Sequence, residues 1–161
     1  MQQTSEWILV KGYSHYCNNK SLFENLTEYR NMMIVDGHEV YGIGDVKLPI
    51  RTSEHSREPK ILHLKNVLYI PSALCNGFEY TFMTARTTII NGIIYCYSCK
   101  DELLCVGLPS ISQYHRLVLF EMPKKPSLLF SNRNQFFDIY LKKKDIKNLY
   151  GENQSYPLYL L

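Results

Sequence analysis

Residue types that bind metals gather in the second half of the chain. Cys96 and Cys99 form a C-x-x-C pair, and Cys105 and His115 follow. Three thiolates and one imidazole can hold zinc in a tetrahedral site. If the apolar run that begins at Ile93 continues as a strand, however, Cys96 and Cys99 point to opposite faces of it. The pattern therefore favours free cysteines over a zinc site, and we expect no metal, no other cofactor and no small-molecule ligand.

Cys17 and His15 are the candidates for nucleophilic catalysis, in which an imidazole takes the proton of a thiol. Residues two positions apart on a strand or turn rarely converge, and no third group that would orient the imidazole is apparent. Cys96 and Cys99 are not suited to redox chemistry either, because no strand-helix unit that would lower a thiol pKa adjoins them. Neither pair indicates an enzyme.

Lysines near the C-terminus could contact the phosphates of a nucleic acid. Acidic residues lie among them, and the net charge of the chain is only +3, from 18 basic and 15 acidic residues. A solvated surface explains this pattern better than a nucleic-acid partner does. The lysines concerned are Lys124, Lys125, Lys142, Lys143, Lys144 and Lys147.

The composition is typical of one β-rich domain. The 161 residues are 45% hydrophobic and 13% aromatic, and branched and aromatic side chains suit strands. We therefore expect an all-β fold with one or two short helices, in a single domain that spans residues 1–161. The first six residues lack a signal-peptide pattern, and no apolar run approaches the roughly 20 residues of a membrane span. We expect no membrane contact, reduced cysteines, and an intracellular, cytoplasmic location with the nucleus as the alternative.

Two dipeptides predict tight hairpin turns. Asp36-Gly37 follows the apolar run 32–35, and Asn91-Gly92 precedes the run 93–97. Both dipeptides supply the positive φ angles that two-residue turns require. Further strands are expected at 6–10, 46–50, 61–70, 103–106, 116–121 and 136–141, with short helices near 22–26 and 142–150 and an exposed loop at 52–60.

Five short segments of the first half follow one another in a recognisable order. Residues 7–16 read WILVKGYSHY, and 21–23 (SLF), 36–37 (DG), 42–46 (GIGDV) and 64–71 (LKNVLYIP) come after them. Together they resemble the protease domain of copia-type retrotransposon polyproteins, which typically opens with WILDSGASHH. The resemblance covers the region 6–83. The region 84–141 is expected to add hairpins that complete a barrel, before a basic tail at 142–161.

The resemblance implies a retropepsin-like closed β barrel in which two identical chains each contribute one aspartate. The two carboxylates share a proton, so one activates water while the other acts as the acid. Position by position, Val10 stands where the family has this aspartate, Lys11 where it has Ser or Thr, and Gly12 on its glycine. Tyr13 replaces a small alanine and, with Lys11, argues against a dimer of the family's kind.

Valine can neither give nor take a proton, so the motif lacks its catalytic group. No Asp-Thr-Gly or Asp-Ser-Gly occurs elsewhere, and Asp36 falls on a turn where the family has no catalytic residue. We therefore expect a catalytically inactive domain from a retrotransposon Gag-Pol polyprotein that acts through protein binding, either as a homodimer or with a polyprotein-derived partner. Two alternatives stay open: an aspartic endopeptidase that works only when paired with an intact, aspartate-bearing chain, and a nucleic-acid-binding module that uses the lysine-rich tail.

Overall fold

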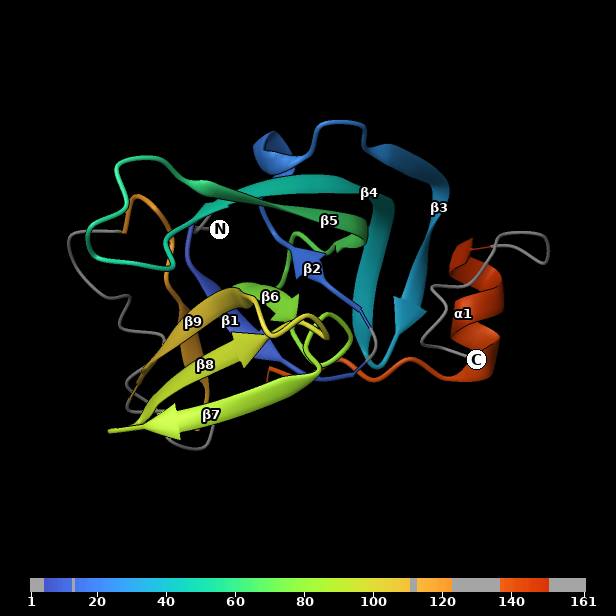
Figure 1. Cartoon of the computed structure of the whole chain (residues 1–161). Coiled ribbons are helices and arrows are strands. Elements are labelled where there is room, and N and C mark those ends of the chain that lie inside the picture. Colours follow the sequence, from blue (N-terminus) through green and yellow to red (C-terminus); the bar gives the residue numbers. More distant parts are fainter. Residues whose placement is uncertain (1–4, 13, 111–112, 123–136, 151–161) are drawn as a thin grey trace.

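The computed structural model describes residues 5–12, 14–110, 113–122 and 137–150. These residues contain ten strands and two short helical segments. The expected all-β class is confirmed (Figure 1). A 3-10 turn, η1, spans Lys20–Leu22, and one α-helix, α1, spans Lys143–Tyr150. Neither of these described helical segments has the length and apolarity needed to cross a membrane. The strands are β1 (Trp7–Val10), β2 (Tyr16–Cys17), β3 (Thr27–Val35), β4 (His38–Ile50), β5 (Lys60–Tyr69), β6 (Asn76–Glu79), β7 (Arg86–Ile90), β8 (Ile93–Tyr97), β9 (Leu103–Pro109) and β10 (His115–Leu117).

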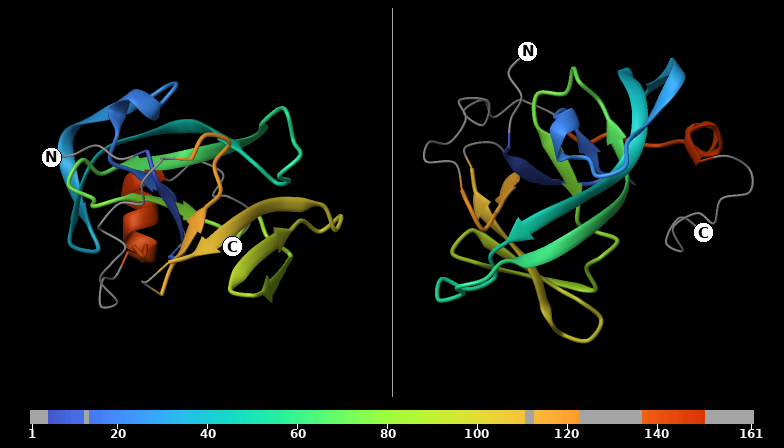
Figure 2. Two further views of the ribbon diagram at one scale, coloured as in Figure 1. Left: turned by 90° about the vertical axis from the view of Figure 1, so that its left-hand side faces the viewer. Right: turned by 90° about the horizontal axis from the view of Figure 1, so that it is seen from above.

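The strands form one curved sheet in the order β3-β4-β5-β2-β6-β1-β10-β9-β8-β7 (Figures 1 and 2). β1 lies in its middle, parallel to β6 on one side and antiparallel to β10 on the other. The expected closed barrel is not confirmed, because the edge strands β3 and β7 do not pair with each other. β3 lies beside α1, where the Tyr29 hydroxyl donates to the Leu149 carbonyl at 3.3 Å. An isolated bridge between Ile50 and Leu119 draws the two halves of the sheet together.

Both predicted hairpins are confirmed. Asp36 and Gly37 join β3 to β4 with φ angles of 48° and 78°. Asn91 and Gly92 join β7 to β8 with φ angles of 51° and 79°. In each turn both central residues have a left-handed backbone, which matches the twist of the strands that they connect.

The strand expected at 136–141 is wrong for the residues that are described. Residues 137–142 have no regular structure. Several of their amides bind side chains and not a neighbouring strand: the amide of Phe137 donates to the Tyr114 hydroxyl at 2.9 Å, and that of Tyr140 donates to the Asp36 carboxylate at 2.9 Å. An apolar alternation in this segment therefore reflects burial of one side and not strand pairing.

Other boundaries also differ from those expected. The strand predicted at 116–121 ends at Leu117, because the next residues turn to bind the end of β4: the Phe120 amide donates to the Pro49 carbonyl at 2.9 Å. The helix expected near 22–26 is reduced to η1, which Asn19 caps by accepting from the Ser21 amide. β2 and β6 were not expected, and both are short strands held by neighbours on each side.

The hydrophobic core consists of two clusters on opposite sides of β1. Because side chains alternate along a strand, Trp7 and Leu9 enter one cluster while Ile8 and Val10 enter the other. The first, which we call the strand cluster, is completed mainly by residues of other strands: Val46, Leu48, Ile50, Leu62, Leu64, Val67, Phe78, Ile94, Cys96, Cys105 and Leu117. The second, the segment cluster, also takes residues that follow the strands: Phe137, Ile139, Leu141, Leu149 and Tyr150.

Candidate functional site

Val10, which stands where the copia-type proteases that the chain resembles have an aspartate, lies at the end of β1. All four residues of β1 are buried, and Val10 is 1% exposed. Val10 is the parallel partner of Glu79 in β6 and packs into the segment cluster. The chain then turns at Lys11, which is exposed, and Gly12, whose φ is 118°. Tyr13 lies outside the described residues.

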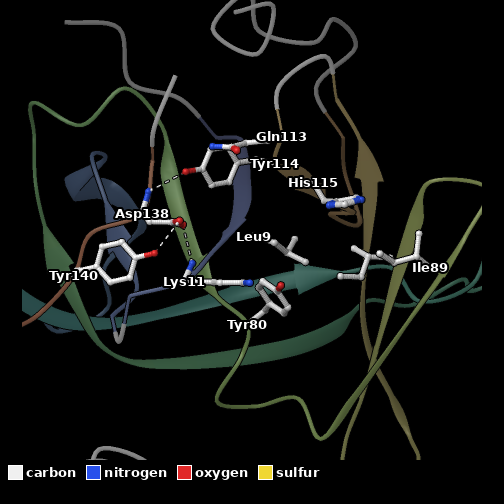
Figure 3. A pocket seen from close by; sticks show the side chains of 10 residues that line it. Leu9, Lys11, Tyr80, Ile89, Gln113, Tyr114, His115, Asp138 and Tyr140 are labelled. Atoms are coloured by element: carbon white, nitrogen blue, oxygen red, sulfur yellow. Dashed lines mark hydrogen bonds between the residues drawn. The ribbon is translucent and has the colours of Figure 1, made fainter. Parts of the chain in front are cut away.

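Residues 137–141 cover this turn (Figure 3). The Lys11 amide donates to Oδ1 of Asp138 at 2.9 Å, and the Leu141 amide donates to the Gly12 carbonyl at 3.2 Å. A Cβ atom placed on Gly12 would lie 2.1 Å from the carbonyl oxygen of Ile139. The segment therefore fits against bare glycine backbone, and the turn has no room for a side chain there.

Two carboxylates lie near Val10, those of Glu79 and Asp138, but they do not face one cleft. Glu79 is fully buried, and its Oε1 accepts from the hydroxyl and the amide of Thr81. Burial raises the pKa of Glu79, and the charge of Asp138 adds to the rise. Asp138 instead binds the Lys11 amide and lines a surface pocket in which Glu79 takes no part. Glu79 therefore stabilises its own turn, and the geometry is not that of two acids sharing one water.

The pocket beside Asp138 has a volume of about 350 Å³. Lys11 extends across it toward Tyr80, and the phenols of Tyr114 and Tyr140 approach Asp138 (Figure 3). Polar and apolar groups are mixed in its lining, which consists of Leu9, Lys11, Tyr80, Ile89, Ile94, Gln113, Tyr114, His115, Asp138 and Tyr140. Such a mixture can hold part of a peptide, with an ammonium and hydroxyls for its polar groups.

His15 and Cys17 do not form a nucleophilic pair. Nδ1 of His15 accepts from the Glu79 amide at 2.9 Å, and the ring stacks on Phe78. Burial lowers the pKa of His15 to about 4, so the imidazole is neutral at physiological pH. Burial likewise raises the pKa of Cys17 to about 12, and its sulfur contacts the backbone of Asn19 at 3.4 Å. Both side chains are structural in this arrangement.

The four residues considered for zinc are not brought together. Cys96 and Cys105 are buried cross-strand partners on β8 and β9, whereas Cys99 is exposed in the turn between these strands. Nε2 of His115 lies 2.9 Å from the Gly92 carbonyl at the other end of β8. Across the part of the chain that the structure describes, no group of three or more His, Cys, Asp or Glu residues could hold a metal ion.

The remaining candidates lie on the surface or outside the described ranges. Asp36 sits in the first hairpin turn and accepts from the Tyr140 amide at 2.9 Å. Lys142, Lys143, Lys144 and Lys147 are exposed at or on α1, where Asp145 accepts from the Lys142 amide at 2.8 Å. Lys124, Lys125 and residues 151–161 of the basic tail fall outside the described residues.

Comparison with known protein families decides which kind of domain this is. Residues 7–88 match the family model described as Pol polyprotein, beta-barrel domain. The chain belongs to this family. The match runs from the start of β1 into β7, and it supports the origin in a retrotransposon polyprotein that the sequence indicates. No curated protein and no solved structure matches the chain.

Asp138 is the site residue that sequence reasoning missed. It is 127 positions from Lys11 in the chain, and no motif surrounds it. Its only signal in the sequence is its place within the apolar alternation 136–141, which predicts a strand. Glu79 was missed for a similar reason, because β6 carries no strand pattern of its own.

Proposed function

We propose that this chain is a copia-type, retropepsin-like domain without proteolytic activity, which acts by binding a protein segment from a polyprotein. The observation that carries the proposal is the state of the Val10 position. An aliphatic side chain that is 1% exposed stands where the resemblance requires an aspartate in contact with water. Without an ionisable oxygen, general acid-base catalysis at this position is lost, a factor of about 10² to 10⁴ in rate.

The cover over the turn gives independent support. In the copia-type proteases that the chain resembles, the turns of two chains face each other, so that two aspartates meet. Here Lys11 and Gly12 already bind the chain's own Asp138 and Leu141 through their backbone groups. A second chain would have to displace residues 137–141, in which the side chains of Phe137 and Ile139 are buried. A mixed dimer with an intact chain is disfavoured for the same reason.

A peptidase assay tests the absence of activity. The chain is incubated with a polyprotein substrate alone and together with an intact homologous protease, and cleavage is followed by mass spectrometry. We expect no cleavage by the chain alone, and no more cleavage in the mixture than the intact protease gives by itself. The Val10→Asp variant should stay inactive, since the cover remains. Pepstatin-sensitive cleavage by the unmodified chain would overturn the proposal.

For binding, the free edge of β7 next to the pocket is the surface that best suits an extended peptide. β7 pairs only with β8 among the described strands, and Ile89 and Ile90 on it are 62% and 55% exposed. An extended segment could add to this edge and place a side chain in the pocket, which Ile89 lines. Fluorescence anisotropy with labelled polyprotein peptides measures the affinity.

A lysine placed on the edge strand β7 tests whether this edge binds the peptide, and a lysine on the other edge strand, β3, is the control. Ile89→Lys should weaken peptide binding about tenfold or more, because a lysine on an edge strand opposes strand addition. Ile34→Lys on the opposite edge strand, where Ile34 is 58% exposed, should leave binding unchanged. Equal loss in both variants, or no binding by any polyprotein peptide, would count against this surface.

A further inference from the structure

Cys96 and Cys105 face each other across two neighbouring strands. They are direct partners in the antiparallel pairing of β8 with β9, and they are 0% and 1% exposed. Opposite residues in an antiparallel pair have Cα atoms about 4.5 to 5.5 Å apart. A disulfide requires a Cα separation of about 4.4 to 6.8 Å. The register of the sheet thus already places these two cysteines at bonding distance.

The two thiols also interact with each other. The contact with Cys105 lowers the pKa of Cys96 despite its burial. The same contact, with burial, raises the pKa of Cys105 far above its ordinary value. Of the two sulfurs, Cys96 is therefore the one that carries negative charge more readily. A thiolate is the form that attacks an oxidant.

We propose that Cys96 and Cys105 are an oxidisable dithiol that closes to an intrachain disulfide when the protein meets a hydroperoxide. The Cys96 thiolate attacks the peroxide, so an S–O bond forms, the O–O bond breaks, and hydroxide leaves as water after taking a proton. The Cys105 sulfur then loses its proton and attacks the Cys96 sulfenic acid, so the S–S bond forms and a second water leaves. Two thiols and one hydrogen peroxide thus give one disulfide and two waters.

The pocket described above lies close to the dithiol. Ile94 lines the pocket and stands two residues before Cys96 on the same face of β8. Tyr80 also lines the pocket, and its pKa is raised by burial and then by the nearby Cys96 thiol, with a smaller effect of Cys105. The dithiol thus lies behind the pocket wall, about one strand repeat from its lining. Opening of the β7–β8 hairpin at the sheet edge would expose it.

The other three cysteines serve as internal controls, because all five lie in the described residues. Burial raises the pKa of both Cys17 and Cys75 to about 12, which suppresses their thiolates. Cys99 is exposed in the turn after β8 and is not a cross-strand partner of another cysteine. If solvent exposure alone decided which cysteine is oxidised, Cys99 would be modified. If the sheet register decides, Cys96 is linked to Cys105.

Peptide mapping of the oxidised protein tests the proposal without any substitution. The full chain is treated with hydrogen peroxide at a small excess, alkylated and digested under non-reducing conditions. We expect loss of the mass of two hydrogen atoms and one linked peptide pair containing Cys96 and Cys105. The melting temperature should rise by about 5 to 10 °C and return with dithiothreitol, as expected for a short closed loop in a chain of this size.

Variants sharpen the result. Cys99→Ser should still lose two hydrogen masses, and Cys105→Ala should instead accumulate added oxygen at Cys96. A link that involves Cys99, a disulfide between two chains, or oxygen added at Cys96 in the unmodified protein with no link would each overturn the proposal. These outcomes do not bear on the proposed absence of protease activity. That proposal rests on Val10, and its cleavage assay uses the reduced protein.

Discussion

The strand cluster and the segment cluster share β1, yet different parts of the chain enclose them. On the side of Trp7 and Leu9, the sheet curves over its own strands and supplies most of the core. On the side of Ile8 and Val10, the enclosure also needs residues 137–150, which contribute only α1 and an irregular segment. The family match at 7–88 contains much of the strand cluster but none of this later segment. The cluster in which Val10 is buried therefore includes residues from a part of the chain that lies outside the match.

Val10 is held by strand pairing on one hand and by packing in the segment cluster on the other. The parallel pairing of β1 with β6 places Val10 opposite Glu79, in the regular register of the sheet. What closes the site is a set of single contacts from the segment, such as Tyr16 donating through its hydroxyl to the Phe137 carbonyl at 2.6 Å. Substitutions can therefore separate the two clusters.

Gly12→Ala should have the largest effect, because it removes the fit between the turn and the segment. The added Cβ would meet the Ile139 carbonyl at 2.1 Å, and alanine at a φ of 118° is strained as well. We expect the free energy of unfolding, measured in urea, to fall by about 4 kcal/mol or more.

Gly37→Ala is the matched control for this substitution. Gly37 also has a positive φ, 78°, but nothing lies within 4 Å of its added Cβ. Its loss should stay near 1 to 2 kcal/mol, the cost of a left-handed alanine alone. If both variants lost the same amount, the close contact between Gly12 and the segment would have no energetic role.

Phe137→Ala should loosen the segment cluster without disturbing the strand cluster. Phe137 is 6% exposed and meets Tyr114 edge to face. Truncation of such a buried ring costs about 3 kcal/mol. Hydrogen exchange should speed up at the Lys11 and Leu141 amides, whereas Leu64→Ala in the strand cluster should speed up exchange across β4 and β5. Uniform exchange changes in both variants would mean that the two clusters open together.

The two hairpins and β4 could be predicted from the sequence far better than β6. Asp36-Gly37 and Asn91-Gly92 fix their hairpins through local backbone preference, and the alternation at 46–50 assigns one side of β4 to the core. β6, in contrast, is a strand because β1 and β2 pair with its two edges, and its residues Asn76, Gly77 and Glu79 carry no strand preference. Local pattern cannot reveal a strand made by its neighbours.

The site shows the same limit. Val10, Lys11 and Gly12 could be located from the motif, because the resemblance is local in sequence. Asp138, which binds the Lys11 amide, could not, since the contact joins positions 127 apart and depends on the path of an irregular segment. The positive φ of Gly12 is one signal for a close approach of backbone, but the sequence does not say which segment approaches.

His15 links the two clusters and should give the chain an acid-sensitive fold. It stacks on Phe78 of the strand cluster and precedes Tyr16 of the segment cluster. Its pKa is about 4 in the folded protein and near its ordinary 6.5 in the unfolded chain, so the unfolded state takes up a proton first. The stability is thus present above pH 6.5 and is lost as pH falls toward 4, by about 2 to 3 kcal/mol.

His15→Asn isolates this contribution. The amide oxygen of asparagine can replace Nδ1 as acceptor for the Glu79 amide, but it does not titrate. The raised pKa of Glu79 acts in the opposite sense, giving stability at low pH that is lost as pH rises through that pKa. The difference between the two proteins in urea midpoints from pH 7 to 4 therefore reports His15. Parallel curves for the variant and the unmodified chain would mean that the pKa of His15 is the same in the folded and the unfolded chain.

Asp138→Asn should produce the smallest measurable change and show whether charge matters to the cover. The asparagine oxygen can still accept from the Lys11 amide, so the loss of the charged acceptor should cost about 1 kcal/mol or less. Asp101→Asn is the control from the strand side, because Asp101 is 75% exposed and pairs with the exposed Arg86 at 2.5 Å. Such surface pairs contribute little, and that variant should unfold like the unmodified chain. A larger loss at Asp101 than at Asp138 would reverse the comparison, since the edge hairpins and not the segment would then depend on charge for their stability.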